Sequence, residues 1–113
     1  MFQTGDAKLL RIFIGESDKI KGLPAYEKIV MLAREKGLAG ATVTKGVMGF
    51  GKNSVIRTAK ILRLSEDLPM IVEIVDKLDK VEEFIAELHK ILDESNCSAM
   101  LTMEKVEVRK YGQ

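Results

Sequence analysis

Two stretches with helical periodicity, each lying between stretches typical of β-strands, constrain the fold of this chain more than any other feature. In the second helical stretch, apolar residues recur at three- and four-residue spacing and mark one face: Val81, Phe84, Ile85, Leu88, Ile91 and Leu92. The first stretch has the same spacing at Tyr26, Ile29, Val30 and Ala33. Each predicted helix therefore has one apolar side that must be buried against another layer.

Strand patterns precede and follow both helices. Continuous or alternating apolar runs predict strands at residues 8–15, 41–48, 70–75 and 100–109, with a shorter one at 60–64 and a turn at 65–69. Residues 46–54 have no regular period and predict a loop or a bulged extension of the strand before them.

Helix ends are also indicated. Pro24 suits a first helical turn, and Gly37 suits the end of the first helix. Asp79 followed by Glu82 predicts an N-cap pair for the second helix, which is expected to end near Asn96.

This order of elements predicts an α+β fold of the ferredoxin-like βαββαβ type. Two crossover units of this kind give an antiparallel sheet with both helices on one face, and we expect a single domain over residues 1–113. The other face of the sheet carries aliphatic residues. We therefore expect it to be buried against identical subunits, so that the protein is a homo-oligomer.

Composition narrows the function classes. A chain of 113 residues that is 46% hydrophobic can bury a core without a metal or disulfides. The 18 basic and 17 acidic residues leave a formal charge of +1, so nucleic acid is not an expected partner. A lone Cys97, no leader-like stretch at the start and no long apolar segment predict a cytoplasmic protein.

The glycine cluster at residues 45–53 is the stretch most suggestive of chemistry. It resembles a phosphate-binding loop, but Asn53 stands where a hydroxyl should hold magnesium, and no helical stripe follows. An NTPase is therefore not predicted. One interpretation is that Gly46, Gly49 and Gly51 serve a bulge and a tight turn that require positive φ.

The other interpretation is functional. Missing side chains would let an anionic ligand approach backbone N–H groups, with Lys45, Lys52 and Arg57 adding positive charge. The residue pattern by itself leaves both interpretations open.

A family resemblance extends over most of the chain. It rests on Gly-Leu-Ala-Gly-Ala-Thr-Val-Thr at 37–44, Gly-Phe-Gly-Lys at 49–52, Leu-Pro at 68–69 and Val-Glu-Ile-Val at 72–75. In this order and spacing the chain resembles the PII nitrogen-signalling family. It is most similar to a PII-like branch known only as conserved and uncharacterised, sometimes encoded beside fluoride exporters.

The resemblance implies a signalling protein rather than an enzyme. It implies a homotrimer with a ligand cleft between adjacent subunits, a mobile loop after Gly51, and regulation of a partner protein such as a membrane transporter. Contacts to a small anionic ligand, for which an adenine nucleotide is the candidate, carry over to residues 49–52, that is Gly49, Phe50, Gly51 and Lys52. Lys105 and Arg109 are loose counterparts of arginines on the last PII strand. No cofactor or metal is expected.

The chain also departs from the PII pattern. Where PII proteins have a glycine-rich segment with a phosphate-gripping lysine, residues 94–99 read Glu-Ser-Asn-Cys-Ser-Ala. The loop between Gly51 and Leu68 contains no tyrosine, so the tyrosine modification of PII proteins is not expected there.

Two other classes are weighed against the sensor. A ferredoxin-like oligomeric enzyme with an intersubunit active site would need a titratable pair, and the sequence offers only scattered candidates such as His89. An RNA-binding domain would need stacking aromatics, which make up only 5% of the chain. Glu73, inside an apolar strand, is expected to pair with a basic residue on a neighbouring strand. His89 is expected at the surface and Cys97 in packing.

Overall fold

The computed structural model describes residues 5–51, 55–59 and 67–112. Its elements follow in the order β1 (Gly5–Gly15), β2 (Lys19–Ile20), β3 (Leu23–Pro24), α1 (Ala25–Glu35), β4 (Thr42–Lys45), β5 (Met48–Gly49), β6 (Arg57–Thr58), β7 (Pro69–Asp76), α2 (Leu78–Glu94) and β8 (Met100–Val108).

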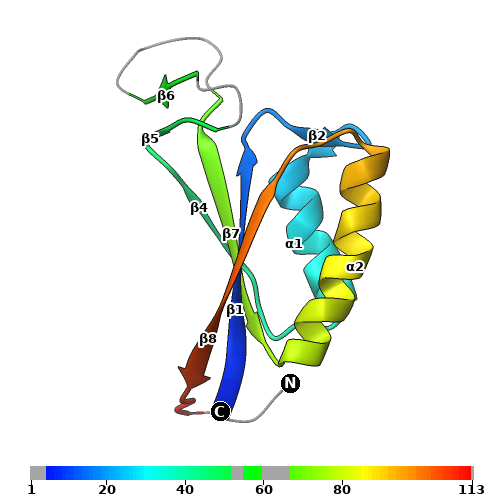
Figure 1. The fold of residues 1–113 in the computed structure, drawn as a ribbon, viewed down its shortest axis with the longest axis vertical. Helices are drawn as coiled ribbons and strands as arrows, with labels where there is room; N and C mark the ends of the chain where they lie inside the picture. The colour runs from blue at the N-terminus through cyan, green and yellow to red at the C-terminus, as the bar shows by residue number, and fades with distance from the viewer. Residues whose placement is uncertain (1–4, 52–54, 60–66, 113) are drawn as a thin grey trace.

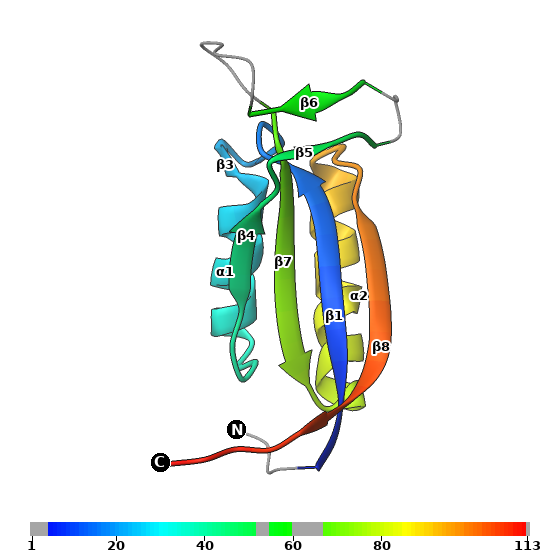
Figure 2. The ribbon, with the colours of Figure 1, turned by 90° about the vertical axis from the view of Figure 1, so that its left-hand side faces the viewer.

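Four strands form the main sheet, in the order β4-β7-β1-β8, and all neighbours run antiparallel. Both helices cover one face of this sheet (Figure 1), and the opposite face, called the open face below, carries no layer (Figure 2). The predicted ferredoxin-like α+β class, with two helices on one side of an antiparallel sheet, is confirmed.

The core lies between the sheet and the helices. Alternate residues of the two central strands point into it, among them Leu10, Ile12, Ile14, Met70, Val72 and Ile74. The helices contribute the predicted stripes, with Ile29, Leu32, Val81, Phe84, Leu88 and Leu92 buried. Period-two and period-3.6 patterns therefore meet in one hydrophobic cluster.

The end of α1 follows the prediction. Gly37 has φ +77° and donates its N–H to the carbonyl of Arg34 at 3.2 Å, while the N–H of Leu38 donates to the carbonyl of Ala33 at 3.0 Å. This Schellman arrangement satisfies carbonyls that a helix end leaves unpaired. At the other end Pro24 is the N-cap residue, one position before the predicted first turn.

The predicted N-cap pair of α2 is wrong. The helix begins at Leu78 after the N-cap residue Lys77, with no side-chain cap bond, and Asp79 lies within the first turn. There its charge still favours the positive end of the helix dipole. The buried carboxylate of Asp76 accepts the N–H of Lys77 at 2.7 Å and that of Ala39 at 2.9 Å, fixing the entry into α2.

The strand predicted at 41–48 is divided. The N–H of Gly46 still donates to the carbonyl of Pro69 at 2.7 Å, but Pro69 has no N–H to return the bond. β4 therefore ends at Lys45, and Met48 pairs with a different strand. β7 begins at Pro69, the residue at which the predicted turn ended. The short strand predicted at 60–64 lies outside the described residues. None of the described helices is long and apolar enough to cross a membrane.

Candidate functional site

A short ribbon formed by β5 and β6 projects beyond one end of the main sheet (Figures 1 and 2). Met48 pairs with Thr58 and Gly49 with Arg57, and the N–H of Ala59 donates to the carbonyl of Val47 at 2.9 Å. The described part of the glycine cluster therefore forms the base and one strand of this ribbon. Arg57, which the sequence assigned to the site, is exposed directly across from Gly49.

Two of the cluster's glycines are required by close packing against Pro69. A Cβ on Gly46 would lie 2.7 Å from the proline Cγ, and one on Gly49 would lie 3.1 Å from the same atom. Positive φ is not the reason, because the glycines with positive φ are Gly5, Gly22, Gly37 and Gly112. The interpretation that these glycines serve a turn with positive φ is therefore wrong. Gly46 and Gly49 still have a structural role, which is close packing against Pro69.

Gly51 differs from the other two. Among the described residues, a Cβ at this position would meet nothing within 4 Å, and φ at Gly51 is not positive, so neither their packing nor the backbone conformation requires glycine here. The preceding Phe50 is 69% exposed. This end of the ribbon presents an accessible aromatic ring next to a backbone without a side chain.

The basic residues around the cluster have separate surroundings. Lys45 Nζ lies 2.7 Å from Glu16 Oε2, so this lysine is paired at the base of the ribbon. Lys52 lies outside the described residues. Of the cations predicted beside the glycines, Arg57 is the one that the described ribbon itself carries.

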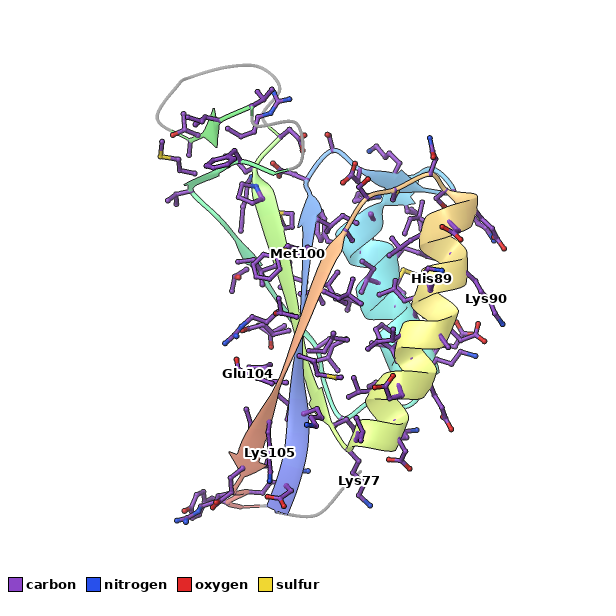
Figure 3. The ribbon with its side chains drawn as sticks, in the orientation of Figure 1. Lys77, His89, Lys90, Met100, Glu104 and Lys105 are labelled. Atoms are coloured by element: carbon purple, nitrogen blue, oxygen red, sulfur yellow. The ribbon has the colours of Figure 1, made fainter. Side chains whose placement is uncertain are left out.

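The two remaining predicted site residues lie at the opposite end of the sheet. Figure 3 shows Met100 and Lys105 toward the two ends of β8, with Lys105 far from the ribbon. Arg109 follows the end of β8, where its Nε lies 2.9 Å from Glu107 Oε1. Within one chain, the structure brings together Gly46, Gly49, Phe50, Gly51 and Arg57 but not Lys105 and Arg109.

The open face contains an ion cluster that the sequence predicted only in part. Glu73 pairs with a basic residue on a neighbouring strand, as expected: Arg11 Nε lies 2.8 Å from Glu73 Oε2. Arg11 also donates from Nη1 to Glu104 on β8. Hydrogen bonds from the guanidinium to the two carboxylates raise the pKa of Arg11 above its ordinary value.

Apolar side chains surround this cluster. Half-buried residues of the three strands share the open face with it: Leu9, Phe13, Ile71, Val75, Val106 and Val108. A shallow hollow at the lower end of the face is lined by Leu9, Ala41, Val75, Val108 and the carboxylate-bearing Glu73. The face thus combines apolar side chains with one central group of charges, beside which lie the exposed Thr42 and Thr102.

A third polar feature, which the sequence did not reveal, closes the loop beneath the ribbon. Asp18 accepts the N–H of Gly15 at 2.9 Å, and Asp67 accepts the N–H of Ser17 at 2.9 Å. Asp67 is 50 positions away from its partner, so no local pattern could indicate the bond. The Asp18 bond closes the turn after β1, and the Asp67 bond holds this turn against the start of β7.

His89 and Cys97 lie where their structural interpretations expected them. His89 is on the exposed side of α2, with Nε2 3.6 Å from Asp93 Oδ2. Cys97 donates from Sγ to the carbonyl of Lys19 at 3.2 Å, and burial raises the pKa of its thiol, with a smaller contribution from Asp18. In the described ranges, no group of three or more His, Cys, Asp or Glu side chains is placed to hold a metal ion.

The chain has the PII-like form of the ferredoxin-like fold, with a four-stranded sheet, both helices on one face and a ribbon that follows β4. Two solved structures of PII-like proteins are similar to it. CPII, a nitrogen regulatory PII-like protein from Thiomonas intermedia K12 bound to ADP, AMP and bicarbonate, matches with TM-score 0.67 and 18% identity, over 91% of this chain and 88% of CPII. A putative PII-like signalling protein from Thermus thermophilus matches with TM-score 0.69 and 15% identity, over 95% and 93% of the two chains.

Residues 7–108 match the DUF190 family, described as "Uncharacterized ACR, COG1993", and the chain belongs to this family. A UPF0166 protein of Aquifex aeolicus (strain VF5) is 39% identical over 101 residues, covering 89% of this chain and 91% of the relative. A UPF0166 protein of Methanocaldococcus jannaschii is 36% identical over 86 residues, covering 76% and 79%. The predicted relation to the uncharacterised PII-like branch is confirmed.

Proposed function

We propose that this protein is a PII-like sensor. It binds a small anionic ligand, an adenine nucleotide being the leading candidate, at clefts between adjacent copies of a homotrimer. It acts by changing which partner protein it contacts rather than by catalysis. The observation that carries this proposal is Gly51, whose missing side chain is not required by packing against any of the residues that the structure describes.

The local chemistry suits an anion with an aromatic base. The backbone at Gly51 is accessible, Arg57 supplies a positive charge across the ribbon from Gly49, and Phe50 offers an exposed ring for stacking. The N–H of Gly46 already donates to the carbonyl of Pro69, so this residue would line the site without donating its N–H to the ligand. Lys52, the next residue in the sequence, would add a second charge.

The separation of the predicted residues supports a site made by two copies. Lys105 lies toward the end of β8 away from the ribbon (Figure 3), and Arg109 follows the end of that strand, so one chain cannot bring them to the ribbon. In a closed ring of identical subunits, one copy presents its ribbon to a different part of its neighbour. The end of β8 is a part of that neighbour that would complete the positive charge of the site.

The nucleotide class is supported by the solved relatives of this fold. CPII has been described with ADP and bicarbonate, and with ADP and AMP together. The segment between α2 and β8 lacks a glycine-rich stretch with a lysine. We therefore expect ADP or AMP, which need fewer phosphate contacts, to bind more tightly than ATP.

The ribbon also suits contact with a partner protein. Its exposed apolar side chains are Val47, Met48, Phe50, Val55 and Ile56. Large apolar residues gathered on a projecting segment mark interaction surfaces. A ribbon this short has little stability of its own, so ligand contacts at its base would change its conformation. A membrane transporter is one partner that would fit such a switch.

Isothermal titration calorimetry with ADP, AMP, ATP and bicarbonate tests the proposal. We expect saturable binding of at least one adenine nucleotide, with heat that is lost when Arg57 is replaced by Ala. Arg34→Ala on the outer side of α1 is the matched control and leaves binding unchanged. A folded, assembled protein that takes up none of the four ligands would contradict the nucleotide assignment.

A further inference from the structure

The charged group at the centre of the open face, formed by Arg11, Glu73 and Glu104 and called the Arg11 cluster, has a feature that its own chain does not explain. One guanidinium faces two carboxylates, so the cluster has a formal excess of one negative charge. Glu104 lies on the side of the sheet away from the helices (Figure 3). Thr102 and Thr42 lie beside the cluster on the same face, directly across from Arg11 and Glu73. Polar groups arranged this way must be satisfied again if the surface is covered.

The cluster retains hydrogen-bonding capacity toward the outside. A guanidinium has five N–H donors, and within the described residues Arg11 uses its Nε and Nη1 groups on the two carboxylates. Each carboxylate has a second oxygen with further lone pairs. Within the described part of the chain, the same surface of every copy thus carries donors and acceptors that the cluster does not use internally, so a second copy can supply the complementary hydrogen-bonding groups.

The surrounding surface favours a second copy over solvent. Apolar side chains flank the cluster on both sides along the strands, with Leu9 and Val75 on one side and Phe13 and Ile71 on the other. These four are only half-buried in the single chain. Covering them would remove apolar area from water and would also desolvate the charges between them.

We propose that the Arg11 clusters of neighbouring copies meet and form one charged network in the interface, and that Arg11 is the residue that makes burial of the two glutamates possible. The inference rests on the proposed homo-oligomer but identifies its polar determinant. It makes two opposite predictions. Removing the positive charge of Arg11 leaves two carboxylates buried in the interface with no cation to compensate them, which weakens assembly. Removing the charge of one glutamate instead removes the excess negative charge, whose burial is unfavourable, and so strengthens assembly.

Arg11→Met keeps the length and apolar stem of the side chain and removes its charge. We expect the protein concentration at half-dissociation to rise by roughly a hundredfold or more, because breaking a buried ion pair from one side is strongly unfavourable. Analytical ultracentrifugation over a concentration series measures this value. Arg34→Met, on the exposed side of α1, is the matched control and leaves it unchanged.

Glu104→Gln is the second variant. We expect it to fold normally, because this side chain is 55% exposed in the single chain. Its amide oxygen still accepts from Arg11 while the cluster becomes neutral. We expect tighter assembly than in the unmodified protein. The inference would be overturned if both variants dissociate at the same protein concentration as the unmodified protein. An unmodified protein that is monomeric throughout would instead contradict the proposed oligomeric sensor.

Discussion

At the scale of single residues, the three glycines near the ribbon have different tasks although their sequence context is similar. Gly46 and Gly49 make room for the ring of Pro69, while a Cβ on Gly51 would meet none of the described residues within 4 Å. Sequence alone suggested either a turn or a ligand contact for all of them. The distinction depends on a contact between residues 46 and 69, which no local pattern encodes.

The packing role of Gly46 can be measured directly. Gly46→Ala would place a Cβ 2.7 Å from the Pro69 ring and 3.3 Å from its carbonyl oxygen. Because a proline ring and a backbone atom yield little, we expect unfolding to become easier by about 1–3 kcal/mol. Urea denaturation measures the change. Gly51→Ala has open space around its Cβ and serves as the control; equal stability of the two variants would contradict the packing role.

Gly51 is expected to respond in the opposite way. Gly51→Val adds a branched side chain where a ligand would approach the backbone, and its Cβ would meet nothing within 4 Å in the ranges that the structure describes. We expect unchanged assembly and a loss of ADP affinity of roughly tenfold or more, the equivalent of a hydrogen bond to a charged group. Calorimetry measures the affinity. Undiminished binding would move the site away from this loop.

At the scale of elements, the pattern of apolar residues specified the main sheet and both helices, because burial on one side enforces periods of two and 3.6. The ribbon escaped prediction because strands of two residues have no period. The start of α2 differs from the prediction: the helix begins at Leu78, and the buried carboxylate of Asp76 accepts the N–H of the N-cap residue Lys77. The partner of Glu73 was expected, but its identity as Arg11 follows from a register between distant strands.

The end of α2 offers a test of helix termination. Asn96 has φ +56°, and the following Cys97 donates its N–H to the carbonyl of Leu92 at 3.0 Å, which closes the helix. Asn96→Val should lower the free energy of unfolding by about 1–2 kcal/mol, because a β-branched residue is strained in this conformation. Asn96→Gly should match or exceed the native stability. Thermal unfolding of both variants provides the comparison, and a harmless valine would contradict this geometry.

At the scale of the whole molecule, the described helices cover one face of the sheet and no described element covers the other (Figure 2). The residues proposed to bind the ligand are divided between the ribbon and the far end of β8. Both features have the same physical solution, which is association of identical copies. Covering the open face buries its apolar side chains and the Arg11 cluster, and the same association can bring the end of β8 to a neighbouring ribbon.

The most direct test of this account is ADP binding measured at protein concentrations above and below the dissociation of the oligomer, by equilibrium dialysis with ultracentrifugation at each concentration. If the site lies between copies, the ADP bound per chain falls as the copies separate and returns on reconcentration. Monomers that bind ADP as well as the assembly does, or an assembly that binds none, would contradict the claim that two copies build one ligand site.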